Sequence, residues 1–277
     1  MSMLEWATKY FKEKQVKNPR LSIEWLLAHV LAVKRLDVYL MHERPLARHE
    51  LDTLRPLVRR RAQHEPLQYI LGETDFLNAR IKVSPGVLIP RQETEQLTDL
   101  VLTQFATVTN QVVFDIGTGT GCIPVAIKLN KPGWHVLACD ISDEALSQAR
   151  ANATLNEVDI EYFSGNLFDR SDWPTLPAID CIISNPPYIL PEEKNTLDVE
   201  VSAFEPELAL FCNTTEQMYR ALCLIGLDLL QPGGHIFLEL HEHHAHEVLA
   251  LFSTVSWKAK IVRDFDGKPR FLTAKRI

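Results

Sequence analysis

The chain has 277 residues, of which 46% are hydrophobic, 23% charged and 8% aromatic. This ordinary globular composition excludes disordered, collagen-like and low-complexity proteins. No apolar run approaches the ~18 residues that cross a bilayer, and the N-terminus lacks the basic and apolar regions of a signal peptide. We therefore expect a cytoplasmic protein without a membrane partner.

The spacing of the cysteines and the distribution of charge disfavour further kinds of protein. The five cysteines form no Cys-x-x-Cys pair, which argues against a disulfide framework or a zinc ribbon. The net charge of −7 is uneven, because residues 1–75 carry +3 and residues 76–277 carry −10. An acidic main body disfavours stable nucleic-acid binding, since a nucleic-acid footprint is usually strongly basic. The asymmetry indicates two modules.

Residues 1–72 have the apolar spacing of a small helical domain, with loop signals at Asn18-Pro19 and Arg44-Pro45. Arg59, Arg60 and Arg61 could bind a partner, but a solvated helix face is the more common role of such a run. Residues 73–90 predict a β-hairpin that turns at Pro85-Gly86 and links this domain to the rest.

After a helix over 91–106, strand and helix patterns alternate, which predicts an α/β, doubly wound parallel sheet. The expected strands are 111–116, 134–139, 159–163, 179–184 and 234–240, and the expected helices between them are 121–130, 142–155, 214–230 and 242–252. The last two strands, 257–263 and 269–275, are separated by only five residues. Because five residues cannot form a crossover helix, this terminal hairpin must be antiparallel. Residues 91–277 thus form the second predicted domain.

A glycine-rich loop follows the first strand of this domain, and it contains Gly117, Thr118, Gly119, Thr120 and Gly121. Glycines between a strand and a helix let the backbone approach a ligand. A Walker loop would require Gly-Lys-Ser/Thr, and the dinucleotide fingerprint would require glycine where Cys122 stands. The remaining pattern, Asp-x-Gly-x-Gly-x-Gly, resembles the S-adenosylmethionine (SAM) loop of doubly wound methyltransferases.

Asp140 ends the next strand and should lie beside this loop, where a carboxylate can bind both ribose hydroxyls. Its alternative role is to cap the following helix, for which Ser142 is the better candidate. The stretch 165–168, which includes Leu167, would flank the adenine. Its alternative is a turn followed by core side chains.

The fourth strand leads into Asn185, Pro186, Pro187 and Tyr188. Two prolines remove two N–H donors, so the carbonyl groups there and the Asn185 side-chain oxygen are free acceptors. Such acceptors suit a planar –NH2 group, whose nitrogen is a poor nucleophile. Holding both hydrogens and stacking Tyr188 on the plane would aim the nitrogen at a methyl donor, which is catalysis by orientation and electrostatics. The alternative is a rigid turn that ends a strand.

This Asn-Pro-Pro-Tyr sequence is similar to the motif of methyltransferases that act on adenine, cytosine and protein glutamine amino groups. The whole chain resembles the HemK/PrmC family, which methylates the glutamine of the Gly-Gly-Gln loop in peptide chain release factors. The further matching strings are 65–72, 85–95 and 204–206.

The resemblance implies SAM as cosubstrate, bound by the loop 117–121, Asp140 and Leu167, with Asn185 between cofactor and substrate. Pro186, Pro187 and Tyr188 would complete the glutamine pocket, and the N-terminal helices would help to hold the release factor. The family's 90–95 segment lies over the cofactor, so secondary candidates are Arg91, Glu93 and Thr94. The chain departs from the family pattern at Gln92, at Asn166 and at Leu240-His241.

Four alternatives remain. A ribosomal-protein glutamine methyltransferase tends to carry Arg-Ser-Pro instead of the Arg-x-Glu-Thr-Glu found at 91–95. A DNA amino-methyltransferase would need a basic cleft, and a SAM-binding scaffold would not need acceptors at Asn185. A metal site in the cluster His241, His243, His244 and His246 is disfavoured, because there is no His-Glu-x-x-His and a polar helix start explains it. We expect a monomer without a metal.

Overall fold

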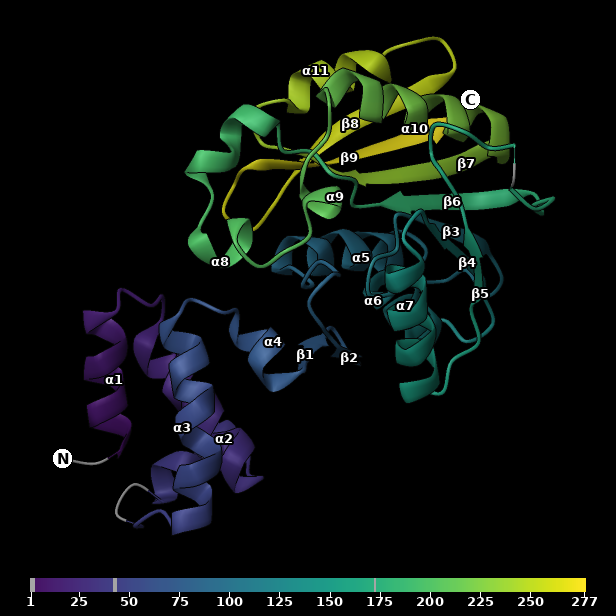
Figure 1. The fold of residues 1–277 in the computed structure, drawn as a ribbon. Helices are drawn as coiled ribbons and strands as arrows, with labels where there is room; N and C mark the ends of the chain where they lie inside the picture. The colour runs from purple at the N-terminus through teal and green to yellow at the C-terminus, as the bar shows by residue number, and fades with distance from the viewer. Residues whose placement is uncertain (1–2, 42–43, 172) are drawn as a thin grey trace. The chain divides into compact units, whose positions relative to one another are not determined.

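The computed structural model describes residues 3–41, 44–171 and 173–277. The contacts divide the chain into two compact units, whose elements are labelled in Figure 1. Met1–Glu73 and Asp198–Phe204 form the first unit, and Thr74–Leu197 and Glu205–Ile277 form the second. The return of 198–204 to the first unit is a feature that the sequence does not indicate.

The first unit is helical, as the apolar spacing predicts. Its core includes the fully buried side chains of Phe11, Ile23 and Leu26. Pro19 occupies the first turn of its helix, where its missing N–H has no intrahelical partner to lose. The elements are α1 (Met3–Glu13), α2 (Pro19–Leu31), the 3-10 helix η1 (Arg35–Met41), α3 (Arg48–Ala62), α4 (Leu67–Leu71) and α8 (Val199–Ser202).

The three consecutive arginines of α3 have different environments. Arg59 is exposed, and Arg60 pairs with Glu65. Arg61 is buried, with Nη2 donating to Glu200 Oε1 at 2.8 Å and Nε donating to Ser22 Oγ at 3.1 Å. The run is therefore neither wholly a solvated face nor a continuous basic patch.

The predicted hairpin exists, but its predicted turn is wrong. Strands β1 (Glu73–Phe76) and β2 (Ala79–Lys82) are joined at Leu77 and Asn78, and Leu77 has a φ of 50°. Pro85 and Gly86 instead belong to a loop after β2. The apolar run 87–89 has the sequence pattern of a strand, but these side chains are apolar because they line a pocket.

The second unit contains a seven-stranded sheet in the order β5-β4-β3-β6-β7-β9-β8. Strands β3 to β7 are parallel to one another, and β9 is antiparallel to both β7 and β8, which confirms the predicted terminal hairpin. Strands β4 and β5 follow on one side of β3, and β6 and β7 on the other, so the order of strands reverses between β3 and β6. The strands are β3 (Val112–Ile116), β4 (His135–Asp140), β5 (Glu161–Ser164), β6 (Ile179–Ser184), β7 (Leu230–Glu239), β8 (Trp257–Arg263) and β9 (Pro269–Arg276).

Helices cover both faces of this sheet, with α5, α6 and α7 on one face and α10 and α11 on the other (Figure 1). Alternate strand side chains, such as Phe114, Ile182 and Ile236, pack into one core with Leu222 of α10. The helices are α5 (Gln92–Gln104), α6 (Cys122–Asn130), α7 (Asp143–Leu155), the 3-10 helix η2 (Pro191–Thr196), α9 (Glu207–Leu210), α10 (Thr215–Leu229) and α11 (Ala245–Leu251).

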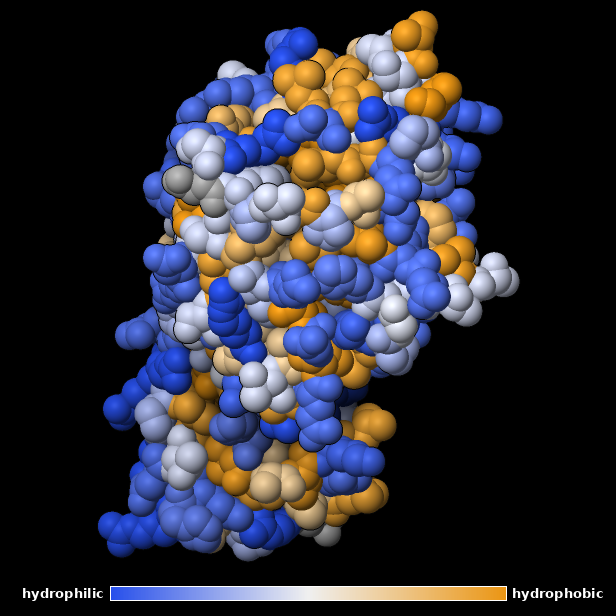
Figure 2. All heavy atoms as spheres, turned by 90° about the vertical axis from the view of Figure 1, so that its right-hand side faces the viewer, coloured by the Kyte–Doolittle hydropathy of each residue, from blue (hydrophilic) through white to orange (hydrophobic). Residues whose placement is uncertain are grey.

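Surface apolar side chains are interspersed with hydrophilic ones on the face shown in Figure 2. Across residues 3–41, 44–171 and 173–277, no helix combines the length and the apolar character that a bilayer crossing requires. All five cysteines are buried and unpaired, as the absence of Cys-x-x-Cys spacing suggests.

Candidate functional site

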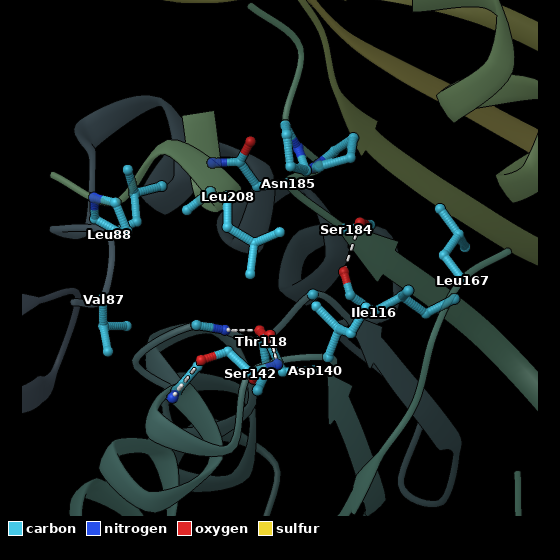
Figure 3. A pocket seen from close by; sticks show the side chains of 18 of the residues that line it. Val87, Leu88, Ile116, Thr118, Asp140, Ser142, Leu167, Ser184, Asn185 and Leu208 are labelled. Carbon is cyan, nitrogen blue, oxygen red and sulfur yellow. Dashed lines mark hydrogen bonds between the residues drawn. The ribbon is translucent and has the colours of Figure 1, made fainter. Parts of the chain in front are cut away.

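A pocket of about 390 Å³ opens at the carboxyl ends of β3, β4 and β6 (Figure 3). The strand order reverses here, and doubly wound sheets bind ligands at such a point. The volume is typical of small-molecule sites. All of its lining residues belong to the second unit.

The glycine loop forms part of the pocket wall. Gly117, Gly119 and Gly121 have φ values of +77°, +55° and +76°, which favour glycine. Gly117, Thr118, Gly119 and Thr120 line the pocket, whereas Gly121 packs against α7, where an added Cβ would lie 2.9 Å from the Cβ of Ala149. The backbone at the start of the loop thus faces the pocket, and the end of the loop packs closely against α7.

Asp140 lies beside the loop and lines the pocket. Its Oδ2 accepts the backbone N–H of Gly119 at 2.8 Å, and its Oδ1 accepts the N–H of Ser142 at 2.9 Å. Burial raises the pKa of Asp140, and these N–H donors oppose the shift. The side chain of Ser142 caps α7 by accepting the N–H of Ala145 at 3.2 Å, which confirms Ser142 as the cap.

A second carboxylate, Asp115, is buried beneath the loop. Neither of its oxygens has a well-oriented hydrogen-bond partner among the described residues. Burial raises the pKa of Asp115 to about 7; the charge of Asp140 adds to the shift, and the Thr118 hydroxyl opposes it. Asp115 is therefore partly protonated at neutral pH.

Asn185, Pro186 and Pro187 line the pocket, and Figure 3 shows Asn185 on the side opposite Thr118, Asp140 and Ser142. Just before them, Ser184 Oγ donates to the carbonyl oxygen of Ile116 at 2.6 Å, which fixes the end of β6 against β3.

Tyr188 is not brought to the pocket with its three motif neighbours. Its hydroxyl donates to Glu239 Oε1 at 3.0 Å, and its ring meets the edge of His241 with centroids 5.9 Å apart. Burial is the main cause that raises the pKa of Tyr188, so the phenol stays protonated and acts as a donor. Stacking of this ring on a substrate amide stays a prediction.

Behind Asn185 lies a chain of hydrogen bonds that the sequence analysis missed. Asn185 Nδ2 donates to Thr94 Oγ1 at 2.9 Å, and Thr94 Oγ1 donates to Glu239 Oε2 at 2.8 Å. Glu239 is 1% exposed, and burial raises its pKa to about 7 against the opposing Thr94 and Tyr188 hydroxyls. In sequence, Glu239 ends an expected strand, as Asp140 does, but nothing near it in the chain indicates Thr94 or Tyr188 as its partners.

The loop after β2 is fixed by Glu205. This carboxylate pairs with Arg91, and its Oε2 accepts the N–H of Ile89 at 3.3 Å. Arg91 and Thr94 line the pocket, but Glu93 does not. Glu205 and the string 85–95, which are distant in sequence, therefore meet in space.

Leu167 and two departures from the family pattern, Asn166 and Gln92, can also be located. Leu167 and Asn166 line the pocket, and Asn166 Oδ1 accepts the N–H of Phe168 at 2.9 Å. The amide oxygen of Asn166 thus already orders the loop, although a carbonyl oxygen can accept a second hydrogen bond. Gln92 is exposed at the start of α5.

The helix at the histidine cluster begins three residues later than the predicted residue 242, so His243 lies in a turn, whereas His246 lies in the first turn of the helix. Helix α11 begins at Ala245, with His244 as its N-cap, and the rings of His243 and His244 lie 5.2 and 5.3 Å from the ring of His241. His241 also lies 3.5 Å from Glu193. Within the described parts of the chain, no group of three or more His, Cys, Asp or Glu residues is arranged to hold a metal ion.

The chemistry of the pocket fits a nucleoside. Asp140 offers a carboxylate beside the glycine loop, Ile116, Leu167 and Phe168 supply apolar surface, and a Cβ at Gly117 would meet nothing within 4 Å. A carboxylate near a glycine loop suits ribose hydroxyls, and apolar walls suit an adenine ring.

Comparisons with known proteins give the family of the chain. Family models described as "PrmC N-terminal domain" and "Methyltransferase small domain" match residues 2–72 and 78–203. A release factor glutamine methyltransferase of Chlorobaculum tepidum is 36% identical over 99% of this chain and 96% of its own length. One from Geobacter sulfurreducens is 37% identical over 91% of this chain and 87% of its own length.

Solved structures bear on the fold alone. A methyltransferase from Pyrococcus furiosus superimposes with a TM-score of 0.54 and 18% identity, over 72% of this chain and 89% of that one. This similarity shows the fold of the second unit and indicates no substrate.

Proposed function

The chain belongs to the release factor glutamine methyltransferase family, and we propose that it methylates the side-chain amide nitrogen (N5) of the glutamine in the Gly-Gly-Gln motif of peptide chain release factors, with SAM as donor. The observation that carries the proposal is the placement of the Asn185 amide across one pocket from Asp140. One side of the pocket is suited to the donor and the other to an acceptor amide.

The donor side consists of the loop 117–120, Asp140 and Leu167. When bound there, SAM supplies an electrophilic methyl group. Asp140, already oriented by two backbone N–H groups, would accept the ribose hydroxyls, while Leu167 would contact the adenine. These residues bind and orient, and none needs to change its protonation state for the transfer.

The acceptor side consists of Asn185, Pro186 and Pro187. Prolines have no N–H, so the backbone there offers only carbonyl acceptors, and the Asn185 side-chain oxygen adds another. A glutamine amide held through its hydrogens is fixed in orientation without a strong base, and the nitrogen loses a proton once methylated. The Tyr188 ring would border this group.

Residues 1–72 would recognise the release factor, 73–90 would serve as the linking segment, and 91–277 would carry the methyl transfer. We expect the protein to act as a cytoplasmic monomer that needs no metal and binds no nucleic acid stably. The alternative, a ribosomal-protein substrate, is disfavoured by Glu93-Thr94-Glu95, because methyltransferases of that kind tend to carry Arg-Ser-Pro in this segment.

The decisive experiment is peptide-mapped mass spectrometry of a purified release factor after incubation with this protein and SAM. A gain of one methyl on the Gly-Gly-Gln glutamine is the expected result. An unmodified release factor, together with methylation of a ribosomal protein in a parallel reaction, would establish the alternative substrate. A control reaction with Asn185→Ala should leave the release factor unmodified.

A further inference from the structure

Two hydrogen bonds connect Asn185 to a carboxylate outside the pocket. Asn185 Nδ2 donates to Thr94 Oγ1 at 2.9 Å, and Thr94 Oγ1 donates to Glu239 Oε2 at 2.8 Å. Thr94 and Glu239 are 4% and 1% exposed. Because water has little access to either group, each must satisfy its hydrogen bonds with protein partners.

The carboxylate fixes the direction of both hydrogen bonds. An ionised carboxylate only accepts hydrogen bonds, so the single hydroxyl proton of Thr94 is used on Glu239. Thr94 can then face Asn185 only as an acceptor. Asn185 must therefore present its –NH2 to Thr94, which leaves its Oδ1 free for another donor.

We propose that Glu239 is a positioning residue for the methyl transfer, which it serves by keeping the side-chain oxygen of Asn185 turned toward the glutamine amide. This inference rests on the proposed function. In the opposite orientation, the –NH2 of Asn185 would face the –NH2 of the substrate, and two donors cannot form a hydrogen bond. Thr94 transmits the constraint and Glu239 imposes it.

Glu239 is itself held from several sides. Tyr188 donates to its other oxygen, Oε1, at 3.0 Å, and Tyr219 donates to its backbone oxygen at 2.7 Å. Tyr188 thereby contributes to the acceptor site through Glu239.

The charge of Glu239 depends on groups from α5, from β9 and from the loop after β6. Burial is the main cause that raises its pKa; the hydroxyls of Thr94 and Tyr188 lower it, the nearby Glu93 of α5 raises it further, and Arg270 of β9 lowers it. A protonated Glu239 can donate to Thr94 and so free Asn185 to turn. The kcat of the wild-type protein should therefore rise through neutral pH, and Glu239→Gln should flatten this rise.

The first test compares Thr94→Val, which removes the hydroxyl at nearly constant volume, with Thr94→Ser, which keeps it. Thr94→Val should lower kcat by about 10- to 100-fold, because the acceptor amide is no longer held in one orientation. Its SAM affinity, measured by calorimetry, should stay within about 3-fold of wild type, a difference of less than 1 kcal/mol. Thr94→Ser should recover most of the lost kcat. Equal losses in both variants would overturn the proposal.

The second readout does not depend on activity. In protein labelled with 15N-asparagine, the Asn185 side-chain –NH2 signal is identified by its absence in Asn185→Ala. Its hydrogen exchange should be slow in the wild type and in Thr94→Ser and fast in Thr94→Val. Exchange that is equally fast in all three proteins would overturn the proposed hydrogen-bond chain from Asn185 through Thr94 to Glu239. If the wild type leaves a release factor unmethylated, the proposed function fails, and this measurement still decides the orientation of Asn185.

Discussion

Arg91 and Glu205, 114 residues apart in the chain, form an ion pair in which the carboxylate side chain is only 1% exposed. The pair holds the loop 83–91 in place as part of the pocket wall, since Glu205 also accepts the N–H of Ile89. A buried carboxylate without its cation is costly, so the integrity of this loop depends on both partners.

The ion pair predicts a strong asymmetry between variants. Arg91→Met should destabilise the protein by about 3 kcal/mol, because it leaves a buried charge unpaired. Glu205→Gln, which can still accept from Ile89, should cost less, and the double variant should recover part of the loss. Urea unfolding of the four proteins measures this coupling. Strictly additive losses would show that the pair has no mutual dependence.

The ribose role of Asp140 is tested by Asp140→Asn. Loss of the charged acceptor should weaken SAM binding at least ~10-fold, which corresponds to about 1.4 kcal/mol. Isothermal titration calorimetry gives the affinity directly, with the exposed Asp159→Asn as the matched control. Equal affinities in the two variants would contradict the assignment of Asp140.

Asn185→Ala removes the acceptor that faces the substrate amide. Methylation of the release factor should fall by ~100-fold or more, in the range seen when one group that stabilises a transition state is deleted. The midpoint of thermal unfolding and most of the SAM affinity should be retained. A variant that turns over at the wild-type rate would disprove the orientation mechanism.

Two buried carboxylates predict how stability depends on pH. The pKa values of Asp115 and Glu239 are raised to about 7 from reference values of 3.8 and 4.5. An acid whose pKa is higher when folded binds its proton more tightly in the native state, so its stabilisation is complete below pH 4 and is lost as pH rises to about 7.

Asp115→Asn should therefore reduce the loss of unfolding free energy between pH 5 and pH 8 by a few kcal/mol, at about 1.4 kcal/mol per pKa unit. Urea unfolding without SAM at both pH values measures the effect, and Asp159→Asn serves again as the control. A slope identical to that of the wild type would mean that Asp115 is ionised at little cost.

Much of the second unit can be predicted from local pattern. The short connection between β8 and β9 forces an antiparallel pair, and the apolar runs of β3, β4 and β6 are long enough to identify buried parallel strands. The same strand ends identify Asp140 and Asn185, because parallel strands bring their carboxyl ends to one edge.

The errors have a common physical origin, which is that burial alone does not reveal what a side chain is buried against. Val87 and Ile89 have the apolar pattern of a strand, but they line the pocket. Glu239 has no recognisable spacing, since its partners Thr94 and Tyr188 are 145 and 51 residues away. Such contacts are determined by the tertiary fold and not by neighbouring sequence.

The return of 198–204 to the first unit affects how the protein can be dissected. Arg61 is buried there, and its guanidinium pairs with Glu200 at 2.8 Å, while Lys17 pairs with Asp198. A fragment ending at residue 73 would keep Arg61 but lose Glu200, leaving a buried charge without its counter-ion at a cost of about 3–5 kcal/mol. The first unit is thus encoded by two separate stretches of the gene, so neither truncation nor domain exchange at a single junction can transfer it intact.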